Sequence, residues 1–241
     1  MRRSPPYADA PTPARSAGIR IAGTFVSPRS RRASTKHRTR SVKYRKLGRD
    51  GPSVSAIGMG RGNQAVKFED EAMVATFNAS IRRAYELGIN FFDSSDAYWG
   101  TRHEVLIGRA VKDFRDKVYI TSKFGNIDLP DGKKATNGRP EYVYECCDAS
   151  LARMGVDVID LYYLHRVDPN VPIEETIGAM ARLVEQGKVR WIGVCEAGPA
   201  TLERAHKTHP VTALQTEYSL WFREVEQDIM PACRKLGIAY V

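Results

Sequence analysis

The sequence predicts an α/β protein built as a (β/α)8 TIM-type barrel, of which about seven strands and six helices are present, with an N-terminal β-hairpin. Short apolar runs alternate with segments of helical periodicity, a pattern typical of a parallel sheet covered by helices. No Gly-x-Gly-x-x-Gly motif follows the first strand, where an open dinucleotide-binding sheet would need it. Polar residues stand at the C-terminal ends of successive strands, where barrel enzymes build their sites.

The first two predicted strands form a hairpin. Tyr44–Leu47 and Val54–Gly58 are short strand-like runs on either side of the turn-forming segment Gly48-Arg49-Asp50-Gly51-Pro52. The second run also counts as the first strand of the barrel. We therefore expect the folded domain to cover residues 43–241.

Helices and strands alternate after this hairpin. In the first helix, apolar residues recur at helical spacing from Met73 to Leu87, and Gly88 ends the helix. The predicted helices cover Phe68–Leu87, His103–Phe114, Pro140–Met154, Ile173–Gln186, Pro199–Thr208 and Glu224–Leu236. The strands between and after them cover Ile89–Phe92, Val118–Thr121, Val158–Leu164, Val189–Val194, Ala213–Thr216 and Ile238–Val241.

Positive charge is concentrated at the N-terminus. The chain carries 37 Lys and Arg against 28 Asp and Glu, a net charge of +9. Residues 1–46 hold 13 of these basic residues and one acid, which leaves 24 basic and 27 acidic residues in the remainder. Nucleic-acid binding needs clustered positive charge, so we expect no nucleic acid as a partner of the folded domain.

Residues 1–42 are rich in Arg, Ser, Pro and Ala and show no sustained periodicity, so we expect a disordered basic tail. Three interpretations stay open. The segment resembles an organelle transit peptide in composition. Its charge also suits a nucleic-acid-binding arm. Alternatively, Val42 marks the true start, and the tail is translated upstream sequence.

Cysteine and histidine usage gives no sign of a disulfide framework or a metal site. Cys146, Cys147, Cys195 and Cys233 form no Cys-x-x-Cys pair, and the five histidines are scattered. No stretch approaches the 18 consecutive apolar residues of a membrane span. We expect reduced thiols in a cytoplasmic protein, or in an organelle if residues 1–42 are a transit peptide.

Four of the strand-end residues suit acid catalysis. Asp93, Lys123 and His165 stand at the ends of successive strands, Tyr98 follows Asp93 by five residues, and a barrel would bring all four to one mouth. A tyrosine hydroxyl is a poor acid near neutral pH, but a nearby ammonium stabilises its anion. A carboxylate can hold that ammonium, and a neutral histidine can orient a substrate oxygen. The set could protonate a carbonyl oxygen as hydride reaches the carbon.

Four segments carry a resemblance to the aldo-keto reductase family over roughly residues 43–241. They are Asn90-Phe91-Phe92-Asp93-Ser94-Ser95-Asp96-Ala97-Tyr98, Ile120-Thr121-Ser122-Lys123-Phe124, Asp160-Leu161-Tyr162-Tyr163-Leu164-His165 and Gly187-Lys188-Val189-Arg190-Trp191-Ile192-Gly193-Val194. The resemblance implies NADPH-dependent reduction of small-molecule aldehydes or ketones, with Asp93, Tyr98, Lys123 and His165 as the catalytic tetrad and Tyr98 as the proton donor. An alternative within this resemblance is a non-catalytic regulatory subunit with the same barrel.

The resemblance also implies the residues that contact the cofactor. They are Gly60, Arg61, Asp93, His165, Cys195, Glu196 and Gln215. Cys195-Glu196 departs from the Ser-Asn or Ser-Glu that is common in the family, and a thiol is a weaker hydrogen-bonding group than a hydroxyl. The family's adenosine and 2′-phosphate contacts lie in loops beyond the last residue of this sequence, together with its last strand and helices. We therefore expect residues 43–241 alone to bind NADPH weakly and to turn over little.

The composition of the tail generates the first prediction. A chain that begins at Lys43 should match the full chain in its thermal unfolding midpoint, because residues 1–42 lack periodic apolar residues that could pack. Thermal unfolding followed by circular dichroism checks this. A midpoint several degrees lower without the tail would contradict it.

Overall fold

A parallel sheet of six strands forms the centre of the fold in the computed structural model, which describes residues 42–61 and 65–241. The strand order is β10-β9-β8-β7-β4-β3. The strands are β3 (Phe91–Asp93), β4 (Tyr119–Phe124), β7 (Ile159–Leu164), β8 (Val189–Cys195), β9 (Ala213–Gln215) and β10 (Ala239–Tyr240). All five neighbouring pairs are parallel, as the alternation of strands and helices predicts.

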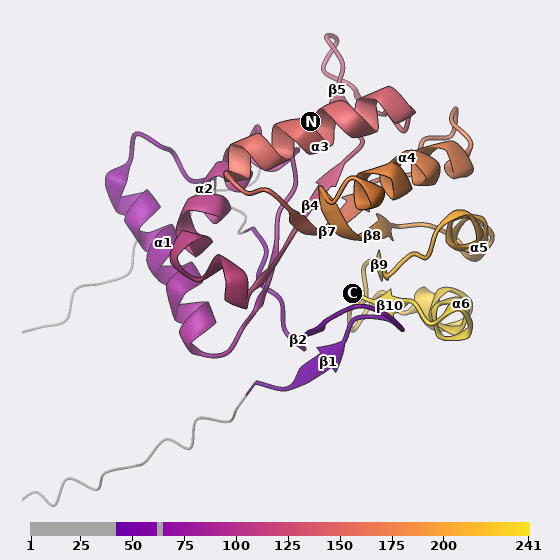
Figure 1. Ribbon diagram of the computed structural model, residues 1–241, viewed down its shortest axis with the longest axis horizontal. Coiled ribbons are helices and arrows are strands. Elements are labelled where there is room, and N and C mark those ends of the chain that lie inside the picture. The colour runs from indigo at the N-terminus through magenta and orange to yellow at the C-terminus, as the bar shows by residue number, and fades with distance from the viewer. Residues whose placement is uncertain (1–41, 62–64) are drawn as a thin grey trace, which may run out of the picture. The chain divides into compact units, whose positions relative to one another are not determined.

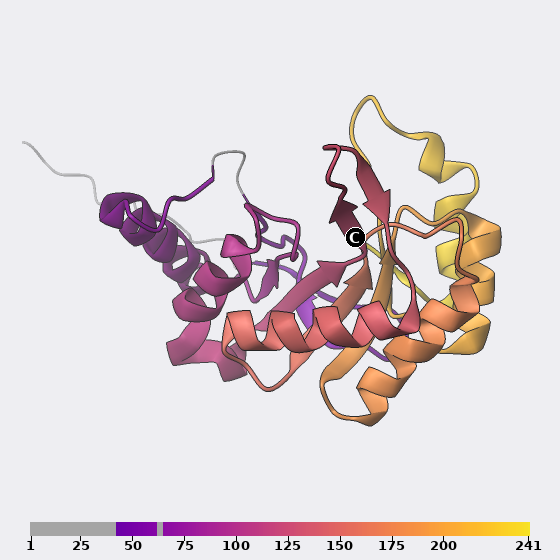
Figure 2. The ribbon, with the colours of Figure 1, turned by 90° about the horizontal axis from the view of Figure 1, so that it is seen from above.

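Six α-helices follow the outer side of the curled sheet (Figures 1 and 2). They are α1 (Glu71–Glu86), α2 (Arg102–Val111), α3 (Pro140–Met154), α4 (Ile173–Glu185), α5 (Pro199–Thr208) and α6 (Ile229–Leu236). Asp70 caps α1 by accepting a hydrogen bond from the backbone of Met73. Gly155 and Gly237 end α3 and α6 in the left-handed conformation. The predicted α/β barrel architecture is confirmed as a curled half-barrel.

Among the described residues, the predicted first barrel strand, Val54–Gly58, does not pair with the parallel sheet, and the one parallel bridge in this region lies just after it, between Met59 and Phe92. The residues before it form the predicted hairpin, in which β1 (Tyr44–Lys46) pairs antiparallel with β2 (Ser53–Ser55). At the end of β2, side-chain hydrogen bonds join Ser55 to the segment before β3, and backbone bonds to β3 begin only at Met59. Asn90 Oδ1 accepts from the backbone N of Ser55 at 2.7 Å, and the Ser55 hydroxyl accepts from the backbone N of Asn90 at 3.1 Å.

Three irregular elements differ from the expected pattern. A 3₁₀ helix, Lys112–Lys117, extends α2, and another, Glu224–Glu226, precedes α6 where one longer helix was expected. A second hairpin, β5 (Asn126–Asp128) with β6 (Lys134–Thr136), lies between β4 and α3. It was not predicted, although Asp131-Gly132 at its tip is a strong hairpin signal.

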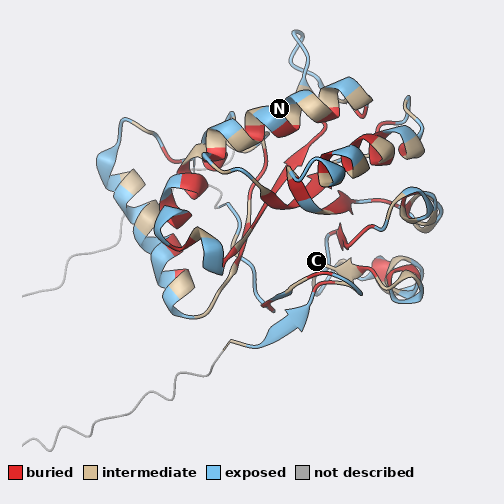
Figure 3. Cartoon of the chain, viewed as in Figure 1, coloured by how far each residue is buried: buried red, intermediate tan, exposed pale blue. Residues whose placement is uncertain are grey.

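Side chains of the sheet divide into two layers because successive residues of a strand point to opposite faces. The outer layer packs against the helices and includes Phe92, Ile120 and Tyr162. The inner layer lies on the concave side and includes Phe91, Leu161 and Tyr163, with Leu47 and Val54 of the hairpin region packed against it. In Figure 3, the central strands β4, β7 and β8 are coloured largely as buried. Because Asp93 and Lys123 alternate with outer-layer residues, both face the concave side.

Gly193 leaves room for the Tyr163 ring in the inner layer. The two residues are register partners on β8 and β7, and the Tyr163 ring lies over the glycine. A Cβ at position 193 would lie 2.4 Å from Tyr163 Cε1 and 2.9 Å from the carbonyl oxygen of Ala213. The ring therefore fills space that only a glycine at position 193 leaves open.

Two sequence expectations concern parts of the chain outside the sheet. Of the predicted tail over residues 1–42, only Val42 is among the described residues. In the part of the chain that the structure describes, every helix is too short or too polar to cross a membrane.

The contact between Gly193 and Tyr163 generates a prediction about stability. Gly193→Ala should lower the free energy of unfolding by about 1–3 kcal/mol, the usual cost of overpacking a core. Gly178→Ala is the matched control. Gly178 lies in α4 with open space around its Cα, so alanine should leave stability unchanged or raise it by up to about 1 kcal/mol. Urea unfolding measures both variants, and equal effects of the two would contradict the packing argument.

Candidate active site

The ends of β3 and β4 bring Asp93 and Lys123 together. Asp93 is the last residue of β3 and pairs in register with Thr121 of β4, so Lys123 stands two residues further along the same face. Lys123 Nζ lies 2.5 Å from Asp93 Oδ2, and Thr121 Oγ1 donates to Asp93 Oδ1 at 2.6 Å. Both carboxylate oxygens of Asp93 therefore have partners on the neighbouring strand.

Lys123 is fully buried, and its ammonium group has three hydrogen-bond partners. Besides Asp93, Nζ donates to the carbonyl oxygen of Ser94 at 2.8 Å and to the hydroxyl of Tyr98 at 3.1 Å. Burial disfavours the charged amine, but the attraction of Asp93, followed by that of Tyr98, raises the pKa of Lys123 above its ordinary value. The site thus holds a permanent positive charge beside the Tyr98 hydroxyl.

Tyr98 lies in the loop after β3, where the backbone turns sharply. Trp99 and Thr101 adopt left-handed φ values of 54° and 70°, with Gly100 between them at 61°. The ring of Tyr98 contacts the ring of His165 edge-on, with centroids 5.9 Å apart. The guanidinium of Arg61 lies 4.8 Å from the Tyr98 ring centroid. Tyr98 is therefore flanked by two cations and one imidazole.

His165 directly follows β7, and its backbone N donates to the carbonyl oxygen of Phe124 at 2.8 Å. Its Nδ1 lies 3.2 Å from the Ser95 hydroxyl. Burial, and then the positive charge of Lys123, lower the pKa of His165 to about 4. The imidazole is therefore neutral at physiological pH, the state in which one ring nitrogen donates and the other accepts.

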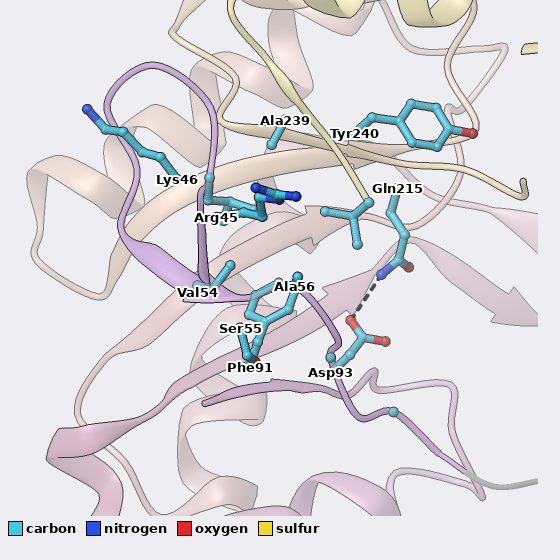
Figure 4. A pocket seen from close by; sticks show the side chains of 14 residues that line it. Arg45, Lys46, Val54, Ser55, Ala56, Phe91, Asp93, Gln215, Ala239 and Tyr240 are labelled. Atoms are coloured by element: carbon cyan, nitrogen blue, oxygen red, sulfur yellow. Dashed lines mark hydrogen bonds between the residues drawn. The ribbon is translucent and has the colours of Figure 1, made fainter. Parts of the chain in front are cut away.

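The predicted cofactor contacts divide into two groups, and Figure 4 shows two members of the first, Asp93 and Gln215. Gln215 ends β9 and donates from Nε2 to Asp93 Oδ1 at 3.3 Å, and Gly60 passes close to the same carboxylate. Cys195 is buried at the end of β8, with Sγ 3.9 Å from Gln215 Oε1. Glu196 lies apart from the tetrad, because its side chain is exposed and accepts from the backbone N of Glu217 at 3.2 Å.

Two cavities adjoin these residues. A cleft of about 1150 Å³ is lined by Arg61, Tyr98 and His165 on one side and by α3 and the β5–β6 hairpin on the other. A smaller cavity of about 350 Å³ lies between the hairpin region and β10, with Gly60, Asp93 and Gln215 in its wall. The four predicted catalytic residues thus lie together between two spaces, one of which has the volume of an ordinary small-molecule site.

The sequence did not identify the residues that hydrogen-bond the predicted catalytic side chains or lie buried beside them. Thr121 bonds Asp93, and Ser95 bonds His165. The signal for Thr121 was the period-2 alternation that puts it on the face of Lys123, whereas Ser95 lies outside the strands and had no such signal. Glu104 is fully buried on α2 and accepts from Ser122 and from Arg153, each at 2.5 Å. No motif identifies this network, because its residues come from three separate elements.

Known proteins resemble this chain throughout the described domain. The model of the Aldo/keto reductase family matches residues 56–241. The protein "Probable aldo-keto reductase 1" of Glycine max is 46% identical over 199 residues, which cover 81% of this chain. The match covers 57% of the Glycine max protein, so this chain spans little more than half the length of that relative.

Two proteins of solved structure show the same fold. A thermostable aldo-keto reductase, Tm1743, in complex with the inhibitor epalrestat, superposes with a TM-score of 0.71 at 31% identity, over 82% of this chain and 71% of that one. The aldo-keto reductase AKR11C1 from Bacillus halodurans, in its holo form, superposes with a TM-score of 0.74 at 28% identity, over 83% and 65% of the two chains.

The environment of His165 generates a prediction about its charge. The imidazole should stay neutral down to about pH 5, because burial and Lys123 lower its pKa to about 4. Titration of the histidine ring signals by NMR, assigned with a His165→Gln variant, checks this. His206, which lies on the outer helix α5, is the comparison within the same spectrum. A midpoint near 6.5 for His165 would contradict the charge environment described here.

Proposed function

The chain belongs to the aldo-keto reductase family, and from that premise we propose that it serves in NADPH-dependent reduction of small aldehydes or ketones to alcohols. One observation carries the proposal. Lys123 Nζ contacts both the Asp93 carboxylate and the Tyr98 hydroxyl, inside a site whose imidazole is neutral. This arrangement supplies a proton to an oxygen that gains negative charge.

The proposed role of each side chain follows from its contacts. Tyr98 donates its hydroxyl proton to the carbonyl oxygen of the substrate, and the ammonium of Lys123 stabilises the phenolate that results. Asp93 keeps Lys123 charged and in place although Lys123 is fully buried. His165, on the wall of the large cleft, donates a hydrogen bond to the same substrate oxygen and so orients it.

The residues around the smaller cavity fit a nicotinamide ring with its carboxamide. Gln215 offers an amide oxygen whose hydrogen-bond partner among the described residues is the Cys195 thiol, at 3.9 Å, and Gly60 leaves the Asp93 side of the cavity free of a side chain. NADPH, when bound, supplies the hydride. The described residues that we propose to hold its nicotinamide half are Gly60, Arg61, Asp93, His165, Cys195, Glu196 and Gln215, with Glu196 acting through its backbone. We further propose a cytoplasmic location.

Removal of the Tyr98 hydroxyl tests this proposal. In a version of this chain that is completed at its C-terminus to the length of its relatives, Tyr98→Phe should lower the rate of carbonyl reduction by about 10²–10⁴-fold, because the proton donor is lost. NADPH affinity should change little, because the ring keeps its shape. Absorbance measures NADPH consumption over a panel of aldehydes and ketones, and fluorescence titration measures binding.

Tyr44→Phe is the control, since its hydroxyl bonds the carbonyl oxygen of Gly88, away from the site. A Tyr98→Phe protein that keeps most of its activity would refute the assigned role. Binding of NADH in preference to NADPH in the same titration would refute the proposed cofactor.

Lys123→Met tests the charge that supports Tyr98. Methionine keeps an unbranched side chain of similar length but removes the positive charge, so the phenolate of Tyr98 loses its stabilisation. Turnover should fall even where NADPH still binds. Arg61→Met is the matched control. The Arg61 guanidinium lies over the Tyr98 ring but does not bond the hydroxyl, so this variant also removes one nearby positive charge. Equal losses of turnover in both variants would show that only the general positive potential matters.

A further inference from the structure

We infer that the hydroxyl of Ser95, together with the carboxyl of Asp96, selects which ring nitrogen of His165 carries the hydrogen. The inference rests on the proposed function, because the choice of nitrogen matters to reduction only if His165 orients a substrate oxygen. It assigns positioning roles to two residues that touch neither the Tyr98 hydroxyl nor Lys123 Nζ through their side chains.

The Ser95 hydroxyl lies between two possible partners at equal distance. Its Oγ is 3.2 Å from His165 Nδ1 and 3.2 Å from Asp96 Oδ1, and it accepts from the backbone N of Ala97 at 3.1 Å. The carbonyl oxygen of Lys123 is a longer contact, at 3.5 Å. A hydroxyl has one hydrogen to donate and two lone pairs. It therefore cannot donate to the imidazole and to Asp96 at once.

Two complete hydrogen-bond arrangements satisfy this geometry. With Asp96 protonated, Asp96 donates to Ser95 Oγ, Ser95 donates to His165 Nδ1, and the imidazole hydrogen is on Nε2. With Asp96 ionised, Ser95 donates to Asp96 Oδ1, and His165 Nδ1 donates to Ser95 Oγ. Each arrangement fills both lone pairs of Ser95, because Ala97 N supplies the other donor. The two arrangements differ in whether the remaining ring nitrogen, Nε2, carries a hydrogen.

Only the first arrangement presents a hydrogen to the substrate. Nδ1 is occupied by Ser95, so Nε2 is the nitrogen available on the wall of the cleft. Nε2–H donates to a carbonyl oxygen, whereas a bare Nε2 lone pair repels it. The imidazole is neutral in both arrangements. On ionisation the Asp96 proton leaves to solvent, and the imidazole hydrogen moves from Nε2 to Nδ1 by exchange with water.

The surroundings of Asp96 put this change within the physiological pH range. Burial, followed by the negative charge of Glu104 on α2, raises the pKa of Asp96 to about 7. The Ser95 hydroxyl, Arg153 of α3 and the backbone N of Ala97 act in the opposite direction. Other titratable groups also face Asp96 or His165. They are Tyr142, Glu145 and Cys146 of α3, Lys123 of β4, Tyr162 of β7, Asp93 of β3, and Arg61, Tyr98 and Arg166 of the loops.

The sign of the pH dependence follows from these states. Below the pKa of Asp96, the carboxyl is neutral and the Nε2–H form is favoured. As pH rises through about 7, Asp96 ionises, captures the Ser95 hydrogen and favours the Nδ1–H form. Reduction should therefore be faster on the acid side of this transition than on the alkaline side.

Nitrogen NMR on histidine-labelled protein tests the switch without cofactor or substrate, because protonated and bare ring nitrogens differ in ¹⁵N chemical shift. His165 should change from Nε2–H to Nδ1–H between about pH 5 and about pH 9. Asp96→Asn should hold the Nε2–H form throughout, because its amide donates to Ser95 as the neutral acid does. Ser95→Ala should remove the pH response.

Ser94→Ala is the matched control. This neighbouring buried serine bonds His103 Nδ1 at 2.8 Å, so its loss should leave the His165 response unchanged. A His165 tautomer that is constant over the pH range in the unaltered protein would overturn the inference. A response that persists in Ser95→Ala would overturn it as well.

Turnover separates this inference from the proposed function. In the unaltered protein, kcat/KM for carbonyl reduction should fall by about 10²–10³-fold across the transition, the effect expected for one lost hydrogen-bond donor. Asp96→Asn should keep the acid-side value. A tautomer switch without any carbonyl reduction would support the inference and refute the proposed function. Tyr98-dependent reduction with a pH-independent tautomer would refute the inference alone.

Discussion

The ion pair between Lys123 and Asp93 is the interaction on which the arrangement of the site depends. An ammonium without solvent exposure is stable only if its charge and all its donors are satisfied, because removal from water costs several kcal/mol per ion. Asp93, the carbonyl oxygen of Ser94 and the Tyr98 hydroxyl meet that requirement together. The hydroxyl of Tyr98 is thus part of the solvation of Lys123, which fixes the tyrosine at the end of its loop.

The same alternation that stabilises the sheet places the site. Outer-layer residues of β3 and β4 pack against helices, so their neighbours Asp93 and Lys123 must face the concave side. In the same inner layer, the buried Tyr163 ring packs over Gly193. Helix α2 contributes a second buried charge, Glu104, whose partners Ser122 and Arg153 neutralise it behind the cleft. The polar groups of the site are therefore bordered by apolar residues of the inner layer and by the Glu104 carboxylate, which is hydrogen-bonded to Ser122 and Arg153.

Much of this arrangement could be predicted from the sequence, because its signals are local. The helical patterns located α3 and α5 to the residue, and strand ends located Asp93, His165 and Gln215. The first barrel strand could not be predicted correctly, since Asn90, distant in sequence, takes the backbone N of Ser55. The bonds of Ser95 to His165 and of Glu104 to Arg153 also join distant segments, and no local pattern records such pairs.

The carboxylate of Asp93 has a consequence for the order of folding. It accepts hydrogen bonds from Thr121 and Lys123 on β4 and from Gln215 on β9, across sequence separations of 28, 30 and 122 residues. Contacts of such separation form late, since loop closure must precede them. The first two can form when β3 and β4 associate, but the third requires every strand up to β9. The Asp93 carboxylate therefore gains all three hydrogen bonds only once the chain has its near-native topology. Local opening of β9 alone is sufficient to break the bond from Gln215.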